Sequence, residues 1–276
     1  MSGSQGRVAF VTGVARGQGR AHAVRLAREG IDIIGIDICE NVESMNYPNA
    51  SAADLEETVR LVEEEGGQIV ARKADVRDYQ AVRTAFDEGH RRFGRLDIIV
   101  ANAGIIRMGP ESEDFLADWN DVIDTNLTGV YHTVRAALPA LREGKRGGSI
   151  VITSSTAGLK APPQLFAGVN AYSAAKRGVV ALMQALAGSL APEWIRVNTI
   201  HPTGVASGMT LNDTMRALQQ QAAAGGSNTI SGMLNALPLQ MLEAEDVANA
   251  VAFLVSDEAK FITGTEWALD AGFMIR

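Results

Sequence analysis

A tyrosine and a lysine four residues apart, Tyr172 and Lys176, have the residue types and the spacing of a proton-transfer pair. On a helix, this spacing places both side chains on one face, about one turn apart. The phenol of a free tyrosine has a pKa of about 10 and is a poor base at neutral pH. A neighbouring cation favours the phenolate, so we expect Lys176 to lower the pKa of Tyr172. Most pairs with this spacing are ordinary surface residues, so the chemistry depends on what surrounds them.

Serine hydroxyl groups precede the pair in the chain. The apolar run over residues 148–153 predicts a strand, and Ser154 and Ser155 follow at its carboxyl end. A serine hydroxyl in this place could hold the oxygen atom whose proton Tyr172 removes. Both serines are candidates for that contact.

A glycine-rich turn near the start of the chain predicts a site for a pyrophosphate. The apolar residues 8–12 predict a buried parallel strand, and residues 20–29 predict an amphipathic helix. Between them, Gly13, Gly17 and Gly19 leave room for backbone N–H groups and a helix N-terminus to approach phosphate oxygens. Their spacing, Gly-x-x-x-Gly-x-Gly, is also compatible with a turn that only packs.

Two charged residues near this turn bear on the choice between NAD and NADP. Asp37 ends the second predicted strand, residues 31–37, about 20 residues after the turn. A carboxylate there can accept hydrogen bonds from the adenosine ribose and repels a 2′-phosphate, which favours NAD. Arg16, within the turn, argues in the opposite direction, because its cation could meet a 2′-phosphate.

Two long connections could cover the bound molecules. The polar residues 38–54 follow Asp37, and connections of this length are uncommon and often functional. We expect them to cover the adenine end of a cofactor; a tolerated surface insertion is the alternative. A second segment, about residues 205–240, is rich in Met, Ala, Gln and Gly and predicts a lid over a hydrophobic substrate.

Strands and helices alternate along the chain, which predicts an α/β fold. We expect one domain over residues 1–276, with a doubly wound parallel sheet and helices on both faces. The further predicted elements are helices over 54–65, 78–93, 113–141, 172–190 and 243–256, and strands over 68–74, 96–101, 196–200 and 265–269. Two of these strands end in residues that parallel sheets use for ligand binding, Asp75-Val76 and Asn102-Ala103-Gly104.

The composition excludes several classes of function. With 46% hydrophobic residues among 276, the chain can bury a large core. The formal net charge of −7 argues against binding to nucleic acid. No apolar run has the roughly 18 residues of a membrane span, and residues 1–6 lack the features of a signal peptide, so we expect a cytoplasmic protein. The single cysteine, Cys39, fits a reducing compartment, and we assign no metal ligands.

Together these motifs resemble the short-chain dehydrogenase/reductase family over nearly the whole chain, residues 7–272. The resemblance is carried by Thr12-Gly-x-x-x-Gly-x-Gly19, Asp75-Val76, Asn102-Ala-Gly104, Asn126, Ser155 and Tyr172-x-x-x-Lys176. It implies a Rossmann-type fold and hydride transfer between NAD and a secondary alcohol or ketone. After the sixth strand the chain departs from the family pattern, because Thr203 replaces a glycine and Ser207 replaces a threonine.

The resemblance implies roles for individual residues. Tyr172 would be the catalytic acid/base, Lys176 would lower its pKa and hold the nicotinamide ribose, and Ser155 would bind the reacting oxygen, with Ser154 as the competing choice. Asn126 would anchor a water molecule that relays protons from Lys176; a purely structural asparagine in the predicted helix is the alternative. The residues expected to contact the cofactor are Gly13, Arg16, Gly17, Gln18, Gly19, Asp37, Ile38, Asp75, Val76, Asn102, Ala103, Gly104, Tyr172, Lys176, Pro202, Val205 and Ser207.

A narrower likeness is to the mycofactocin-associated, carveol-dehydrogenase-like branch of the family. It is carried by Ala15-Arg-Gly-Gln-Gly19, Ile36-Asp-Ile-Cys39, Tyr47-Pro48 and His201-Pro-Thr203. It implies a tightly held NAD covered by the inserted segment, hydrophobic secondary alcohols such as terpenoids as substrates, and a redox partner. The family likeness also implies a homotetramer. The alternatives are a ketone or 3-oxoacyl-type reductase of the same family and a non-catalytic, nucleotide-binding regulator.

Overall fold

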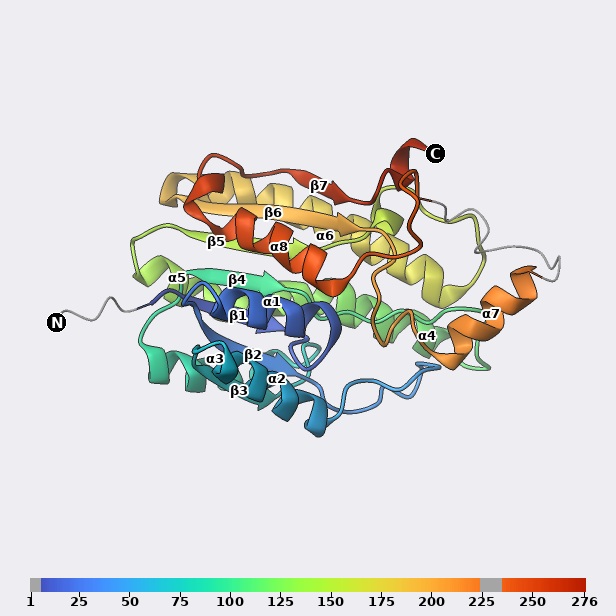
Figure 1. The fold of residues 1–276 in the computed structure, drawn as a ribbon, viewed down its shortest axis with the longest axis horizontal. Coiled ribbons are helices and arrows are strands. Elements are labelled where there is room, and N and C mark those ends of the chain that lie inside the picture. The colour runs from blue at the N-terminus through green and yellow to red at the C-terminus, as the bar shows by residue number, and fades with distance from the viewer. Residues whose placement is uncertain (1–5, 224–234) are drawn as a thin grey trace.

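In the part of the chain that the structure describes, seven parallel strands form one sheet, in the order β3-β2-β1-β4-β5-β6-β7. The computed structural model describes residues 6–223 and 235–276, with the backbone alone for 221–223. The strand arrows in Figure 1 all point toward one end of the molecule. The order changes direction between β1 and β4, where sheets of this kind bind ligands beyond the strand ends. The strands are β1 (Val8–Thr12), β2 (Asp32–Asp37), β3 (Ile69–Lys73), β4 (Ile98–Ala101), β5 (Gly148–Thr153), β6 (Ile195–Pro202) and β7 (Glu266–Leu269).

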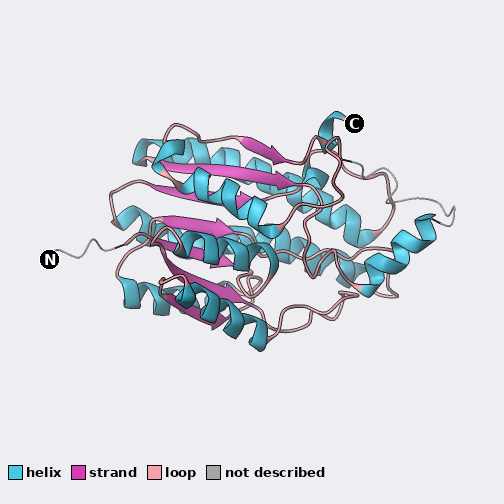
Figure 2. Cartoon of the chain, viewed as in Figure 1, coloured by secondary structure: helices cyan, strands magenta, loops and turns pink. Residues whose placement is uncertain are grey.

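Helices cover both faces of this sheet, which confirms the predicted doubly wound fold (Figure 2). One face carries α1, α2 and α8, and the other carries α3, α5 and α6, with α4 packed on α6. The helices are α1 (Gly17–Ala27), α2 (Ala52–Glu64), α3 (Tyr79–Phe93), α4 (Phe115–Ile123), α5 (Gly129–Glu143), α6 (Ala167–Leu190), α7 (Asp213–Ala223) and α8 (Ala244–Val255).

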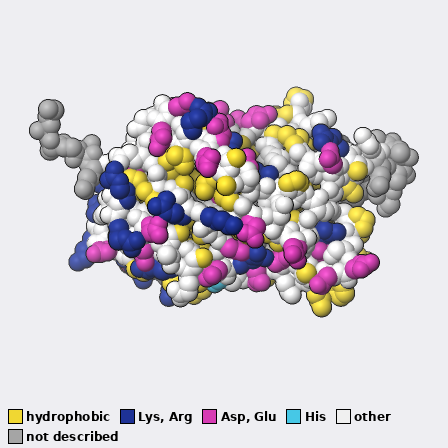
Figure 3. All heavy atoms as spheres, turned by 90° about the horizontal axis from the view of Figure 1, so that it is seen from below, with side chains coloured by type: hydrophobic (Ala, Val, Ile, Leu, Met, Phe, Trp, Pro, Cys, Tyr) yellow, Lys and Arg dark blue, Asp and Glu magenta, His cyan; other side chains and the backbone are white. Residues whose placement is uncertain are grey.

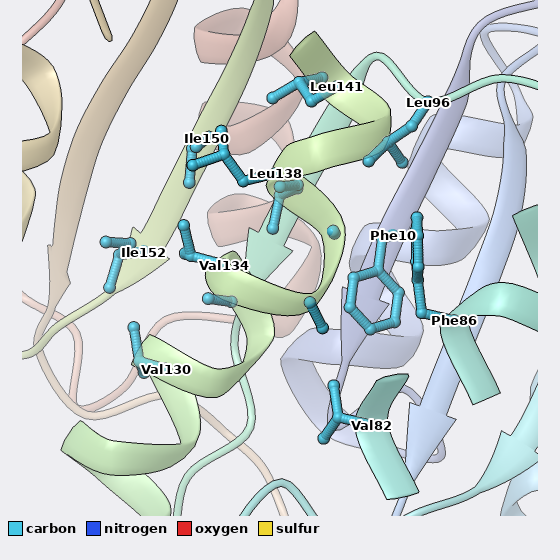
Figure 4. Close-up of a cluster of buried hydrophobic side chains, with 14 of the residues drawn as sticks. Phe10, Val82, Phe86, Leu96, Val130, Val134, Leu138, Leu141, Ile150 and Ile152 are labelled. Carbon is cyan, nitrogen blue, oxygen red and sulfur yellow. The ribbon is translucent and has the colours of Figure 1, made fainter. Parts of the chain in front are cut away.

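The alternation of side chains along the central strand explains the two layers. All five residues of β1 are buried. Val8 and Phe10 face the core under α3, α5 and α6, whereas Ala9 and Val11 face the core under α1, α2 and α8. Figure 4 shows part of the first core, where the rings of Phe10 and Phe86 lie with their centroids 5.2 Å apart. A strand buried on both faces is the form that a continuous apolar run predicts.

Helices α1 and α6 begin three or more residues earlier than the sequence predicted. α1 begins at Gly17 rather than at residue 20, so the last two glycines of the turn lie inside the helix. α6 begins at Ala167 rather than at residue 172. A Cβ atom on Gly168 would lie 2.7 Å from the carbonyl oxygen of Arg107, so the missing side chain allows this first turn to pack closely. Close packing here outweighs the low helix propensity of glycine.

The single helix predicted over residues 113–141 is wrong. The segment forms α4, then a π-helical turn over Asp124–Thr128, then α5. The Asn126 side chain donates from Nδ2 to the carbonyl oxygen of Val122, four residues earlier, at 2.8 Å. We attribute the local widening to this contact, which takes a backbone acceptor of the helix. Single π turns inside helices are frequent at functional sites.

The surface is charged with both signs. On the face shown in Figure 3, Lys and Arg side chains are interspersed with Asp and Glu side chains. Among the described helices, none combines the length and the hydropathy needed to cross a membrane. Residues 6–223 and 235–276 contain no group of three or more His, Cys, Asp or Glu side chains arranged to hold a metal ion.

Candidate active site

The candidate catalytic residues meet at the carboxyl end of the sheet. The end of β5 supplies Ser155, and α6 supplies Tyr172 and Lys176 on one face, as their spacing predicts. All three line a cavity of about 730 Å³. The three side chains therefore converge although Ser155 is distant in the sequence from the other two.

The two candidate serines have different surroundings. Ser154 is 2% exposed, and its hydroxyl donates to the carbonyl oxygen of Lys176 at 2.7 Å. Ser155 is half-buried, and its hydroxyl forms a hydrogen bond with Tyr172 that lowers the pKa of the phenol. Ser155 is thus the serine that faces the phenol, whereas Ser154 ties β5 to α6.

The electrostatics of Tyr172 differ from the expected charge pair. Burial raises the pKa of Tyr172, and this effect exceeds the lowering by Ser155. Burial also lowers the pKa of Lys176, to about 7. The Lys176 Nζ donates to the carbonyl oxygen of Thr153 at 2.8 Å and lies 5.4 Å from the centre of the Tyr172 ring. Burial is the largest influence on the pKa of Tyr172 in this arrangement, and the lowering of that pKa by Lys176 stays a prediction.

Asn126 presents an unpaired acceptor beside the lysine. Its side chain is fully buried, and Nδ2 donates to the carbonyl oxygens of Ile105 at 2.7 Å and Val122 at 2.8 Å. Its Oδ1 has no hydrogen-bond partner among the described residues. A Cβ on Gly104 would lie 2.7 Å from that oxygen and 3.4 Å from the Lys176 Nζ. Gly104 therefore keeps open the space between a buried acceptor and a buried amine.

A second cavity, of about 140 Å³, joins the first. It runs along the glycine-rich turn to the ends of β2, β3 and β4. All of the predicted cofactor contacts except Gly19 line one cavity or the other. Gly19 has a packing role instead, because a Cβ there would lie 1.9 Å from the carbonyl oxygen of Gly13. The residues common to both cavities are Gln18, Asn102, Gly104, Ser207 and Met209.

Asp37 lies at the end of β2, as predicted, and is bound to the backbone. Its carboxylate accepts the N–H of Ala15 at 2.9 Å and that of Cys39 at 3.3 Å. Burial raises the pKa of Asp37, and these hydrogen bonds together with the charge of Arg16 oppose the rise. The carboxylate therefore fixes the glycine-rich turn and at the same time lines the smaller cavity.

The inserted segment forms a wall of the smaller cavity. Val42, Tyr47, Asn49 and Ala50 line it, and the covering of a cofactor by this segment stays a prediction. Arg16 also lines this cavity. Its Nη2 donates to the carbonyl oxygen of Pro48 at 2.7 Å, and a Cβ on Gly208 would lie 2.7 Å from its Cζ. Arg16 thus connects the insertion to the segment after β6, a contact that its position in the turn did not predict.

The larger cavity has a mainly apolar outer part. Its apolar lining includes Met108, Met209, Met215, Met241, Leu237 and Phe273. Met215 lies on α7, which Figure 1 shows in orange beyond the strand ends. The lid predicted over about 205–240 stays a prediction, and residues 224–234 of that segment lie outside the described residues. Phe273, near the carboxyl terminus, was not predicted, since nothing in its local sequence marks it as a lining residue.

Comparisons with known proteins cover almost the whole chain. Residues 13–274 match the family model described as "Enoyl-(Acyl carrier protein) reductase". An uncharacterised oxidoreductase of Mycobacterium tuberculosis is 50% identical over 98% of this chain and 97% of its own. The (−)-trans-carveol dehydrogenase of Rhodococcus erythropolis is 43% identical, with 100% of both chains covered. The crystal structure of a carveol dehydrogenase from Mycobacterium avium in complex with NAD has a TM-score of 0.90, 47% identity and 98% coverage of both chains.

Proposed function

The chain belongs to the short-chain dehydrogenase/reductase family of oxidoreductases, and we propose that it oxidises hydrophobic secondary alcohols of the carveol-like, terpenoid kind with NAD. One observation carries this proposal. The Ser155 and Tyr172 hydroxyl groups lie in a largely apolar cavity that joins a glycine-lined cleft. An alcohol in that cavity would present its hydroxyl to the phenol and its carbon skeleton to apolar side chains.

The residues of the smaller cavity fit NAD. Gly13 and Gly17 have positive φ angles of 69° and 55°, so the backbone of the turn is shaped as close approach to phosphate requires. Asp37 lines the far end of the cleft with a carboxylate, which suits a ribose with free hydroxyls. The solved carveol dehydrogenase complex with NAD supports the same choice. When bound, NAD would accept the hydride from the carbinol carbon.

In this mechanism, the protein moves the hydroxyl proton and stabilises charge on oxygen. Tyr172 removes the proton of the alcohol, and Ser155 donates a hydrogen bond to the reacting oxygen. The raised pKa of Tyr172 makes the phenol a stronger base once it has lost its own proton.

Asn126 and Lys176 are proposed to carry the proton away from Tyr172. The free Oδ1 of Asn126 could hold a water molecule in the space kept open by Gly104. Lys176, with a pKa lowered to about 7, is able to both donate and accept a proton near neutral pH. These properties support the relay that the family resemblance implies. A purely structural asparagine would have no reason to leave a buried acceptor unpaired.

The insertion supports slow exchange of the cofactor. Val42 and Tyr47 lie along the cleft, and the hydrogen bond from Arg16 to Pro48 fastens the segment over it. We propose that NAD stays bound between turnovers and passes its electrons to a redox partner of the mycofactocin type. We also propose a cytoplasmic homotetramer, built on the helices that carry Asn126 and Tyr172.

The proposal is tested by following the absorbance of reduced nicotinamide. The purified protein is incubated with NAD and a panel of alcohols that contains carveol, cyclohexanol and a primary alcohol of equal size. We expect reduction with the secondary alcohols and preference for carveol. If no secondary alcohol reduces either NAD or an added artificial electron acceptor, the proposed function is refuted.

A further inference from the structure

A third apolar cluster lies beside the reacting groups, apart from the two cores on the faces of the sheet. Tyr172, Ile38, Ile123 and Met209 pack against it as partly buried side chains. The cluster combines four segments of the chain: the insertion, the loop after β4, helix α4 and helix α6. Its buried members are Val42, Met45, Tyr47, Ile105, Val122 and Ala171.

This cluster reaches the backbone on both sides of the proposed chemistry. Ala171, which is fully buried, directly precedes Tyr172 in α6. Ile105 and Val122 are the two residues whose carbonyl oxygens accept the hydrogen bonds of the Asn126 amide. The same apolar cluster therefore borders Tyr172 and the two residues whose carbonyl oxygens hold the Asn126 side chain.

The insertion is anchored on either side of Met45. The Ser44 carbonyl oxygen accepts from Arg107 Nη1 at 2.9 Å, and Asn46 Nδ2 donates to the carbonyl oxygen of Met108 at 2.7 Å. α7 adds a third contact, from the hydroxyl of Thr214 to the carbonyl oxygen of Asn46 at 2.8 Å. These bonds fix the backbone of the insertion, so Met45 enters the cluster from a defined position.

We propose that Met45 is a positioning residue, which holds Tyr172 and Asn126 in place by filling the cluster that borders both of them. The role rests on the proposed function, since it serves that reaction. Met45 is 9% exposed and lines neither cavity, so it acts through its neighbours and not by contact with a ligand. Tyr47 is a less direct probe, because its side chain also lines the cofactor cavity.

Close packing explains why one side chain can have this effect. Protein interiors are packed as densely as organic crystals, so the loss of a buried side chain shifts its neighbours or leaves a void. Ala171 and Val122 are both fully buried. Ala171 precedes Tyr172 in the chain, and the carbonyl oxygen of Val122 accepts a hydrogen bond from Asn126. A displacement of about 1 Å at a reacting group costs roughly a hundredfold in rate.

The test compares Met45→Ala with Met45→Leu and with Glu43→Ala, an exposed change in the same segment. One readout is kcat and KM for carveol oxidation. The second is the titration of Tyr172, followed by nuclear magnetic resonance of isotope-labelled tyrosine and assigned with Tyr172→Phe. We expect Met45→Ala to lower kcat roughly tenfold to a hundredfold with little change in KM. It should also lower the pKa of Tyr172, because water enters the cluster and relieves the burial that raises it.

Met45→Leu should restore both readouts, and Glu43→Ala should leave both unchanged. If Met45→Ala is folded and keeps the wild-type kcat and the wild-type titration of Tyr172, the proposal is overturned. If Met45→Ala does not fold, Met45→Val is measured in the same way, and wild-type values in that variant overturn it equally. If the wild-type protein oxidises no alcohol, the proposed function fails, while the tyrosine titration still decides whether Met45 positions Tyr172.

Discussion

At the scale of single residues, burial controls the candidate site more than charge pairing does. Tyr172 and Lys176 share a helix face, yet burial moves their pKa values toward the neutral forms, upward for the phenol and downward for the amine. Burial therefore separates the proton affinities of the two groups, and the Tyr172 phenolate is the stronger base of the pair. Asp37 shows the same pattern, as its pKa is raised by burial while two backbone N–H groups hold the carboxylate.

The lowered pKa of Lys176 predicts how stability depends on pH. Its pKa falls from 10.5 to about 7 on folding, so between these values the unfolded chain binds a proton that the folded chain releases. Stability contributed by this group therefore rises with pH across that interval, and below about pH 7 the full cost of burying the ammonium remains. We expect the thermal midpoint of the wild type, relative to Lys176→Met, to increase between about pH 7 and about pH 9. A difference that stays constant with pH would contradict the assignment.

The charge of Asp37 predicts cofactor choice. Asp37→Asn removes the charge and keeps an oxygen that can accept the Ala15 N–H, so the turn should persist. We expect the ratio of NADP to NAD use to rise roughly tenfold, since repulsion of the 2′-phosphate is lost. Asp32→Asn at the other end of β2 is the matched control and should change nothing. If selectivity is the same in both variants, Arg16 or the insertion determines it.

At the scale of elements, the insertion lines the cofactor cavity and is held in place by several hydrogen bonds. It has its own apolar cluster, it borders the cofactor cavity, and it is bound by the glycine-rich turn, the loop after β4 and α7. The π-helical turn also depends on side-chain hydrogen bonding, since we attribute it to the bond from Asn126 to the carbonyl oxygen of Val122. Both elements depart from regular structure at the place where the chemistry is proposed, as strained or irregular elements often do.

The link between Arg16 and Pro48 predicts cofactor retention. Arg16→Ala removes the hydrogen bond, and Gly208→Ala places a Cβ against the guanidinium, so both should loosen the insertion. A partly exposed bond of this kind contributes about 1 kcal/mol, which corresponds to roughly fivefold faster release of NAD. The measurement is the displacement of bound NAD by an excess of labelled NAD. Arg25→Ala, which removes a surface ion pair on α1, is the control. Equal rates of NAD release in all variants would show that the bond between Arg16 and Pro48 does not retain the cofactor.

At the scale of the whole molecule, helices α4 and α5 expose large apolar side chains. Phe115, Leu116 and Trp119 of α4 are 50%, 58% and 38% exposed, and Tyr131 of α5 is 46% exposed. Exposed apolar groups gathered on neighbouring elements mark surfaces that bind another protein. α4 also packs on α6, so an assembly through this surface would support the helix that carries Tyr172.

This surface predicts the oligomeric state. We expect native mass spectrometry to report a tetramer for the wild type and smaller species for Trp119→Asp, because a buried charge would oppose association. Leu165→Asp, in the loop before α6 where the side chain is 90% exposed, is the control and should remain tetrameric. A wild-type monomer, or a tetramer unaffected by Trp119→Asp, would contradict the prediction.

Much of this fold could be predicted from the sequence, because local patterns determine it. Apolar runs such as residues 8–12 define buried strands, and alternating helices define the winding of the sheet. Contacts between distant segments could not be predicted. The start of α6 depends on the packing of Gly168 against Arg107, and the pKa of Lys176 depends on its burial. Met45 carries no motif, and only the cluster around it indicates a role.

The central claim is that Tyr172 takes a proton while hydride leaves the carbinol carbon for NAD. Its most direct test uses carveol labelled with deuterium at the carbinol carbon, with mass spectrometry of the cofactor recovered from the wild type and from Tyr172→Phe. We expect deuterium in the reduced cofactor of the wild type and at least a roughly hundredfold lower rate of transfer in Tyr172→Phe, with NAD still bound. Equal transfer in both proteins, or reduced cofactor without deuterium, would contradict the mechanism.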